Sequence, residues 1–194
     1  MQSVTGQKRY VLFYKPFQVL CQFSREGEKK TLADYVDVPD IYPAGRLDFD
    51  SEGLVFLTDD GNMQHRLTDP RFGHDRTYWV QVEGAIDSGA LEQLRLGVVI
   101  AGKKTLPCQA ETMPEPLLAA RQPPVRFRKN IPTSWLGLRL REGRNRQVRH
   151  MTAAVGFPTL RLVRAAIGEF TLAGLSPGEW RHLSVCERAH LLKI

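Results

Sequence analysis

The sequence predicts an α+β fold, a mixed and mainly antiparallel sheet with flanking helices. Three observations carry this prediction. Residues 10–14, 76–82 and 136–141 are rich in β-branched and aromatic side chains or alternate in polarity, which indicates strands. Residues 88–96 and 145–155 have the periodicity of helices. Several connections are too short to hold a crossover helix, so most neighbouring strands are expected to be antiparallel.

The remaining elements are assigned from caps and breakers. Residues 31–36 predict a short helix capped by Thr31, and residues 54–57 predict a buried strand. The acids at 59–60 precede a helix of about seven residues that ends before Asp69-Pro70. Gly156 is placed to close the helix at 145–155. Further short strands are expected from there to the end of the chain.

Positive charge is concentrated in one part of the chain. The formal net charge is +6, but residues 121–149 alone carry nine basic residues against the single acid Glu142. Such asymmetry is typical of a surface that binds nucleic acid, although a solvated, loop-rich surface is the alternative. The basic, proline-rich segment at about 112–134 is expected to form a loop or a strand edge.

Composition and length favour a single domain over residues 1–194, with lobes at roughly 8–70 and 71–194. The apolar runs are too short for a membrane span, and the first residues lack the pattern of a signal peptide. The three cysteines lie far apart without a CxxC pair, which argues against a disulfide framework or a zinc site. A cytoplasmic protein without a resident metal is therefore expected.

The segment GRLDFDSEGLVFLTDDG, residues 45–61, contains the strongest candidate site. It places Asp48 at a turn just before the buried run LVFL. The same acids match several positions of a calcium-binding EF-hand loop, but prolines at 39 and 43 exclude the helix that must precede such a loop. A pair such as Asp48 with Asp50 could instead serve a glycosidase, and a purely structural turn is the third reading.

A second candidate segment, GRNRQVRHMTAAVG at residues 143–156, has arginines at helical spacing. Arg146 and Arg149 lie three residues apart and so share one face of the predicted helix. A guanidinium aimed at a buried carboxylate would keep that carboxylate ionised. Solvated arginines are the alternative, which fits Arg144 better than Arg149.

Taken in order, these segments resemble the RNA pseudouridine synthases, and most closely their RsuA-like group. The segment around Asp48 matches the family signature throughout. Tyr14-Lys15-Pro16 resembles the first family motif, and Arg76-Thr77-Tyr78 resembles its basic-x-Tyr strand. Residues 143–149 and the LVRAAIG run at 162–168 resemble the third motif and its continuation. The family fold is a mixed, largely antiparallel sheet crossed by a catalytic cleft.

The resemblance implies a role for individual residues. Asp48 corresponds to the catalytic aspartate, Tyr78 to the residue that packs on the target uracil, and Arg149 to the arginine that pairs with the aspartate. Arg46 corresponds to an arginine that occupies the space left by the flipped base, with Leu47 beside it in the substrate site. Further RNA contacts are expected from Lys15, Arg126, Arg128, Lys129, Arg144 and Arg146.

The implied activity is the isomerisation of uridine to pseudouridine in ribosomal RNA, with 23S rRNA as the substrate. Nothing is oxidised and no group is added, so no cofactor is expected, and nothing requires more than a monomer. Only about ten residues precede the first strand, so no S4-type RNA-binding domain is expected in this chain. Two alternatives remain open, a non-catalytic RNA- or ribosome-binding module and an N-glycosidase that acts on RNA.

Overall fold

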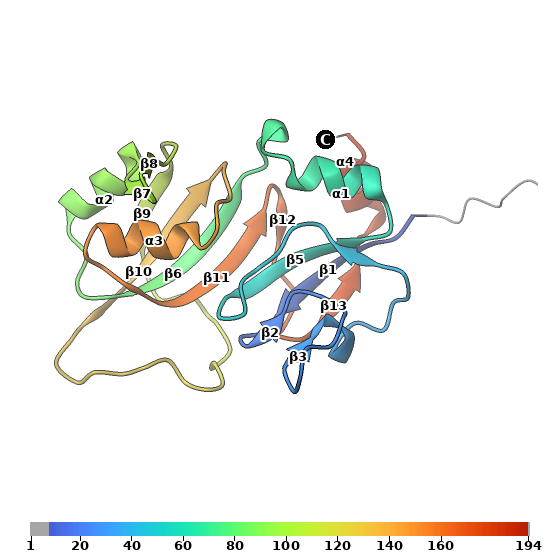
Figure 1. The fold of residues 1–194 in the computed structure, drawn as a ribbon, viewed down its shortest axis with the longest axis horizontal. Helices are drawn as coiled ribbons and strands as arrows, with labels where there is room; N and C mark the ends of the chain where they lie inside the picture. Colours follow the sequence, from blue (N-terminus) through green and yellow to red (C-terminus); the bar gives the residue numbers. More distant parts are fainter. Residues whose placement is uncertain (1–7, 194) are drawn as a thin grey trace, which may run out of the picture.

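A computed structural model describes residues 8–193 of the protein (Figure 1). The expectation that no signal peptide is present concerns residues 1–13, of which residues 1–7 lie outside the described part. The strands are β1 (Tyr10–Lys15), β2 (Val19–Leu20), β3 (Lys30–Thr31), β4 (Tyr42–Pro43), β5 (Glu52–Thr58), β6 (Arg76–Glu83), β7 (Val99–Ile100), β8 (Lys103–Lys104), β9 (Gln109–Met113), β10 (Thr133–Leu140), β11 (Thr159–Ile167), β12 (Phe170–Thr171) and β13 (Trp180–His182). The helices are α1 (Gly61–Thr68), α2 (Ser88–Leu96), α3 (Gln147–Ala154) and α4 (Val185–Leu191), with 3₁₀ turns at Leu32–Asp34 and Pro70–Phe72.

A nine-stranded sheet forms the centre of the molecule, in the order β13-β1-β5-β11-β6-β10-β9. Strands β4 and β12 attach to β5 and β11, respectively. Its pairs are antiparallel except for β5 with β11, which confirms the predicted α+β fold with a mixed, mainly antiparallel sheet. Figure 1 shows β11 between the half that contains β1 and β5 and the half that contains β6 and β10.

The parallel contact between β5 and β11 depends on a glycine. Gly53 pairs with Arg164 and has a φ of +114°, which an L side chain rarely adopts. A Cβ at this position would lie 2.3 Å from the main-chain oxygen of Arg164. Because no neighbour can yield that much, the two strands can approach only with glycine here. The approach brings the start of β5 against the middle of β11.

Apolar side chains on the two faces of the sheet form three clusters. One cluster joins β1, β5 and α4, through Leu12, Phe56 and Leu191 among others. A second cluster packs α2 and α3 on β6 and β10, with Leu94 and Met151 fully buried. A third lies under the turn that leads into β5 and contains Leu47. The turn that carries Asp48 is therefore anchored on a packed core.

The end of the chain differs from the expectation of short strands. The segment 159–167 forms β11, a strand of nine residues whose last seven side chains are buried. The C-terminal part also contains helix α4, which begins with a capping box between Ser184 and Glu187. The lobe division at residue 70 remains a prediction, and β13 crosses it by pairing with β1.

Two shorter predictions also need correction. Residues 31–36 form only a 3₁₀ turn at Leu32–Asp34, although Thr31 and Asp34 do make a capping box around it. The helix expected at 145–155 begins later, at Gln147, because Arg146 adopts a left-handed conformation. Helix α1 and helix α2 agree with the sequence prediction, with Asp60 and Asp87 as their N-caps. Among residues 8–193, no helix is both long and apolar enough to cross a membrane.

Candidate active site

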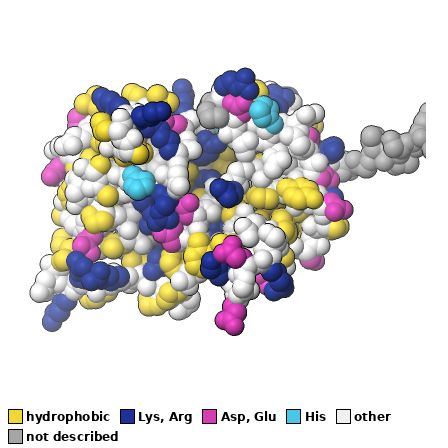
Figure 2. All heavy atoms as spheres, viewed as in Figure 1, with side chains coloured by type: hydrophobic (Ala, Val, Ile, Leu, Met, Phe, Trp, Pro, Cys, Tyr) yellow, Lys and Arg dark blue, Asp and Glu magenta, His cyan; other side chains and the backbone are white. Residues whose placement is uncertain are grey.

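A pocket of about 570 Å³ opens where the two halves of the sheet meet. Figure 2 shows a hollow in the middle of this face, with Lys and Arg side chains visible inside it. The charged and aromatic residues that line the pocket come from four separate segments, and they include Arg46, Asp48, Arg76, Tyr78, Arg146 and Arg164. The structure thus brings together the segments around Asp48, Tyr78 and Arg146 that the sequence singled out.

The turn before β5 holds Asp48 at the wall of the pocket. The amide of Ser51 donates to the main-chain oxygen of Asp48 at 3.1 Å, and the amide of Gln18 donates to that of Phe49 at 2.8 Å. Leu47 lies beneath the turn in the core and is 8% exposed. The side chain of Asp48 remains 37% exposed. No side chain or amide of the described residues donates a hydrogen bond to this carboxylate, which leaves both of its oxygens free to react.

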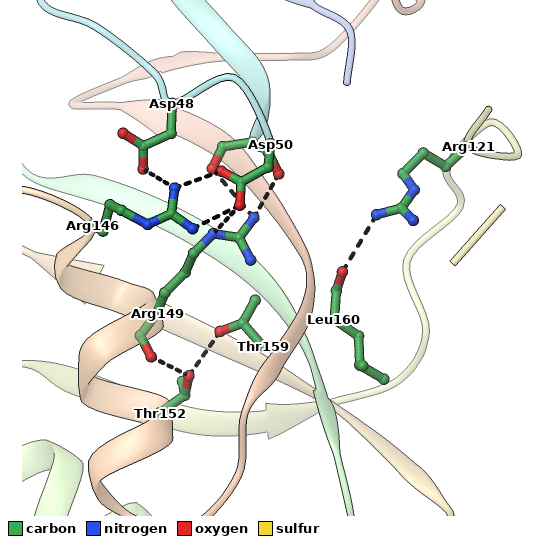
Figure 3. A network of polar contacts seen from close by, with 9 residues as sticks. Asp48, Asp50, Arg121, Arg146, Arg149, Thr152, Thr159 and Leu160 are labelled. Carbon is green, nitrogen blue, oxygen red and sulfur yellow. Dashed lines mark hydrogen bonds and ion pairs between the residues drawn. The ribbon is translucent and has the colours of Figure 1, made fainter. Parts of the chain in front are cut away.

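Arg146 faces both acids of the turn (Figure 3). Its Nη1 and Nη2 donate to the two carboxylate oxygens of Asp50 at 2.8 and 2.7 Å, whereas Nη1 lies 3.7 Å from Asp48 Oδ2. The arginine precedes helix α3 with φ +50° and ψ +30°. A left-handed non-glycine residue costs of order 1–3 kcal/mol, and its bidentate ion pair helps to hold it there.

The pKa of the Asp50 carboxyl is lowered. Partial burial by itself would raise this pKa, but the hydrogen bonds from Arg146 and the charges of Arg149 and Arg146 outweigh that effect. Asp50 is therefore ionised at neutral pH and neutralises much of the positive charge of the two arginines. Asp48 can then act beside these arginines without being tied to them.

Arg149 contacts Asp50 rather than Asp48. Its Nη2 donates to the main-chain oxygen of Asp50 at 2.5 Å, and its Nε lies 3.4 Å from the Asp50 carboxylate. The direct pairing of Arg149 with Asp48 expected from the resemblance is thus not present in this structure. The reason is one of position: Arg149 is the third residue of α3, whereas Arg146, just before the helix, lies nearer to Asp48.

Tyr78 lines the pocket from strand β6, and Arg46 lines it from the loop between β4 and β5. Tyr78 lies on β6, is half-buried and packs on the apolar clusters of both halves of the molecule. Arg46 is exposed, and none of the described residues forms an ion pair with it. These positions are compatible with the roles implied by the resemblance, which remain predictions here.

Lys15 does not lie on an RNA-accessible surface, which corrects the prediction made for it. Its side chain is fully buried, and its Nζ donates to the main-chain oxygens of Pro16 and Val19 at 2.9 and 2.8 Å. Burial is the main cause that lowers the pKa of Lys15 to about 8. The side chain turns back under the loop after β1 and shapes this loop instead of reaching solvent.

The other predicted RNA contacts fall into two groups. Arg144 lines the pocket, donates to Glu142, and bonds the main-chain oxygens of Lys103 and Lys104 at 3.2 and 2.8 Å. Three residues of the proline-rich loop are exposed and do not line this pocket, namely Arg126, Arg128 and Lys129. Their contact with RNA stays a prediction.

The acids around Asp48 do not converge on a common point. Asp50 is bonded to Arg146, Glu52 to Arg161 at 2.8 and 2.9 Å, and Asp59 to Arg9 at 2.8 Å. Within residues 8–193, no group of three or more His, Cys, Asp or Glu side chains could hold a metal ion. The arrangement gives no support to the calcium-loop reading.

Two arginines of the pocket were not assigned a role from the sequence. Arg76 stands two residues before Tyr78, and Arg164 lies in the LVRAAIG run on β11. The available signal, for Arg164 alone, was a charged residue inside the apolar run LVRAAIG. Such a residue is costly to bury and is retained only with specific partners or a function.

The comparisons with known proteins agree with this geometry. The family model described as RNA pseudouridylate synthase matches residues 9–154. A solved structure described as "Crystal structure of pseudouridylate synthase" superimposes with a TM-score of 0.78 at 27% identity, covering 96% of this chain and 74% of that one. The chain therefore belongs to the RNA pseudouridylate synthase family, which confirms the resemblance seen in the sequence.

Within the family, two relatives that are more than half identical to this chain share one name, and a less similar relative has another. A protein of Vibrio parahaemolyticus named "Ribosomal large subunit pseudouridine synthase E" is 52% identical over 92% of this chain and 75% of its own length. A protein of the same name from Xanthomonas axonopodis pv. citri is 57% identical over 86% of this chain and 90% of its own length. The "Ribosomal small subunit pseudouridine synthase A" of Escherichia coli is 36% identical over 95% and 74%, respectively.

Proposed function

We propose that this protein isomerises uridine to pseudouridine in ribosomal RNA, with 23S rRNA as the substrate and Asp48 as the catalytic carboxylate. The observation that carries the proposal is the free carboxylate of Asp48 at the wall of a pocket that also contains Tyr78. The choice of 23S rRNA rests on the names of the relatives that are more than half identical.

The target uridine must leave its stack to enter the pocket, which costs a few kcal/mol. Stacking of the base on the ring of Tyr78 offsets part of that cost, since base–aromatic stacking contributes about 1–3 kcal/mol. Arg46 is exposed beside the pocket and is suited to fill the place of the flipped base in the RNA. The tyrosine is assigned to stacking first, because its half-buried ring lines the pocket.

Asp48 acts on the ribose while the N1–C1′ bond is broken, either as a nucleophile at C1′ or as a base on the sugar. The uracil then turns and bonds C1′ through C5, and C5 loses its proton. The reaction is an isomerisation without net redox change, so it needs no cofactor. Arg146 and Arg149 hold the turn by way of Asp50, which keeps the reactive carboxylate in place.

We assign the exposed Arg126, Arg128 and Lys129 to the RNA backbone, together with Arg144 and Arg146 at the pocket. Electrostatic contacts of this kind position the RNA without reading its sequence. We also propose that the protein acts in the cytoplasm. We propose a monomer, because the residues that line the pocket all come from one chain.

Tritium release tests the proposal directly. Protein-free 23S, 16S and transfer RNA labelled with tritium at uridine C5 are each incubated with the protein and with Asp48→Asn. C5 must lose its hydrogen when it bonds C1′, so release reports the isomerisation itself. We expect the unmodified protein to release tritium from 23S rRNA. Asp48→Asn should release it at least about 1000-fold more slowly, as expected when a catalytic group is lost, and should still bind the RNA.

Three results would redirect the assignment. Full activity of Asp48→Asn would remove the carboxylate from the mechanism. Tight binding without release from any RNA would favour the non-catalytic RNA- or ribosome-binding module. Free uracil with an abasic site, in place of the isomer, would identify an N-glycosidase.

A further inference from the structure

Arg164 lies at the floor of the pocket with part of its guanidinium unused. The side chain is 3% exposed, and its Nε donates to the main-chain oxygen of Leu54 at 2.7 Å. Nη1 lies 3.4 Å from the main-chain oxygen of Arg46, immediately before the Asp48 turn. Nη2 is buried and has no hydrogen-bond partner among the described residues. A buried charged donor without a partner is unfavourable, so its retention calls for a reason.

The strand pairing points Arg164 at the place where the base would lie. Arg164 is the register partner of Tyr78 on β6, and side chains at paired positions lie on the same face of a sheet. On its other side, Arg164 pairs with Gly53, where a Cβ would collide with the main chain of Arg164. The sheet is thus built to bring this arginine up against the start of β5 and the turn of Asp48.

A second guanidinium joins it from β6. Arg76 precedes Tyr78 by two residues, so both side chains lie on the same face of the strand. It lines the pocket, is half-buried and donates to the main-chain oxygen of Leu67 at 3.3 Å. Burial lowers the pKa of Arg76, and the nearby charge of Arg164 lowers it further, while Tyr78 opposes the shift.

Neither of these guanidiniums is neutralised. Within residues 8–193, no carboxylate forms an ion pair with Arg76 or Arg164. The other arginines of the pocket are either paired, as Arg146 with Asp50 and Arg144 with Glu142, or exposed to water, as Arg46 is. Two neighbouring cations, one half-buried and one buried, that lack a counterion among the described residues form a site for negative charge.

We propose that Arg76 and Arg164 form a cationic floor under Tyr78 that stabilises the uracil as an anion after the N1–C1′ bond has broken. The inference rests on the proposed function. When this bond breaks, its electron pair stays on N1, and the negative charge spreads over N1, O2 and O4 of the ring. Arg76 is the more accessible of the two arginines and contacts the base. Arg164 is a positioning residue, which adds its positive charge from beneath the pocket surface.

The remaining steps balance without another reactant. C1′ is left short of electrons, and Asp48 either bonds it or takes a proton from the sugar. C5 then supplies the pair for the new bond to C1′, and Asp48 leaves the sugar or returns its proton. The proton on C5 is lost, N1 takes up a proton, and the neutral pseudouridine forms. The floor has its greatest effect when the base is detached, which is where charge develops.

The test separates the chemical step from binding. Single-turnover tritium release from C5-labelled 23S rRNA at saturating protein is measured for Arg76→Gln, Arg76→Lys and Arg164→Gln, together with the RNA dissociation constant at several salt concentrations. Arg71→Gln is the matched control, because Arg71 is 79% exposed and lies outside the pocket. We expect Arg76→Gln to release tritium about 100-fold more slowly and Arg164→Gln at least 10-fold more slowly, with dissociation constants within about threefold. Arg76→Lys keeps the charge and should retain more of the rate than Arg76→Gln.

Each other outcome overturns part of the argument. Weaker RNA binding and a smaller salt slope, in proportion to the lost rate, would mean that the floor holds a backbone phosphate. Unchanged rates in both glutamine variants would remove the floor altogether while leaving the proposed function intact. No release by the unmodified protein would overturn the proposed function and this inference with it. If Arg164→Gln fails to fold, Arg76→Gln and Arg76→Lys decide the question, because Arg76 lies at the pocket surface.

Discussion

Arg146 and Asp50 form a bidentate ion pair across 96 residues of sequence, with both bonds shorter than 3 Å. The same guanidinium lies 3.7 Å from Asp48. One arginine thus stands between two carboxylates and bonds only one of them. Asp50 takes up the hydrogen-bonding capacity of Arg146, and Asp48 is left as the unbonded carboxylate of the turn.

Removing the charge of Asp50 should therefore impair Asp48. In Asp50→Asn, residue 50 offers Arg146 one acceptor oxygen in place of two and no negative charge, so Arg146 turns towards Asp48 and bonds its oxygens. We expect turnover to fall about 10- to 100-fold and the free energy of unfolding to fall by only about 1 kcal/mol, since the pair is partly exposed. Tritium release and denaturant unfolding measure the two effects.

Glu187→Gln is the control for this change. Glu187 accepts two hydrogen bonds from Arg181 at 2.7 Å each, with similar side-chain exposure, but the pair lies outside the pocket. This variant should lose comparable or somewhat greater stability, because Glu187 also caps α4, and keep its activity. Equal losses of turnover in the two variants would show that Asp50 acts through stability alone.

Tyr78→Phe separates stacking from proton transfer. The ring stays in place between the two apolar clusters, so RNA affinity should remain within about threefold of the unmodified protein. If the hydroxyl takes part in the loss of the C5 proton, tritium release falls while binding persists. Full activity would restrict Tyr78 to stacking. Tyr78→Ala, which loses the ring, should then weaken both RNA binding and tritium release.

The proline-rich loop can be tested by its salt dependence. Arg126 and Lys129 are exposed without an ion pair among the described residues, whereas Arg128 is paired with Glu83 at 3.0 Å. Replacing both Arg126 and Lys129 by Gln should reduce the slope of log K against log salt by about 1.4, or roughly 0.7 for each lost contact with single-stranded RNA. Arg128→Gln should change the slope less, because Glu83 already neutralises that charge. A slope unaltered by the double substitution would place the loop away from the RNA.

The sequence predicted well those helices and strands whose caps and residue types lie within or next to the element itself. Asp60 and Asp87 cap helices that follow at once, and β6 has the residue types of a strand. Strand β11 was missed as a long element because Arg161 and Arg164 interrupt its apolar pattern. Both arginines are buried. Arg161 is neutralised there by an ion pair with Glu52, a partner that comes close only when the sheet has folded.

The site shows the same limit. Asp48, Tyr78 and the arginine segment were found through their resemblance to a family, since spacing alone left a glycosidase pair and a purely structural turn open. Choosing between Arg146 and Arg149 as the neighbour of Asp48 was beyond the sequence, because both share one helix face. The left-handed backbone at Arg146 places this side chain before the helix and near Asp48, and no local sequence pattern predicts that conformation.

The buried ammonium of Lys15 should make stability depend on pH. Burial is the main cause that lowers its pKa from 10.5 in the unfolded chain to about 8 in the folded protein. Below pH 8 both states are protonated, and the folded state carries the full penalty of the buried charge. As the pH rises from 8 towards 10.5, the folded state sheds its proton first, so the unfolded state binds more protons and the free energy of unfolding increases.

Lys15→Met removes this contribution. We expect the unfolding free energy of the unmodified protein to gain about 2 kcal/mol relative to Lys15→Met between about pH 7 and pH 9.5. The loss of the bonds to Pro16 and Val19 shifts the variant by an amount that does not depend on pH, so the slope is the measurement. Burial also raises the pKa of Tyr10 and Tyr14 to about 12, which lowers stability above pH 10, but this acts on both proteins and lies beyond the window. Parallel curves from denaturant unfolding at each pH would show that the Lys15 ammonium is hydrated in the folded protein, and that it does not hold the loop after β1 as a buried charge.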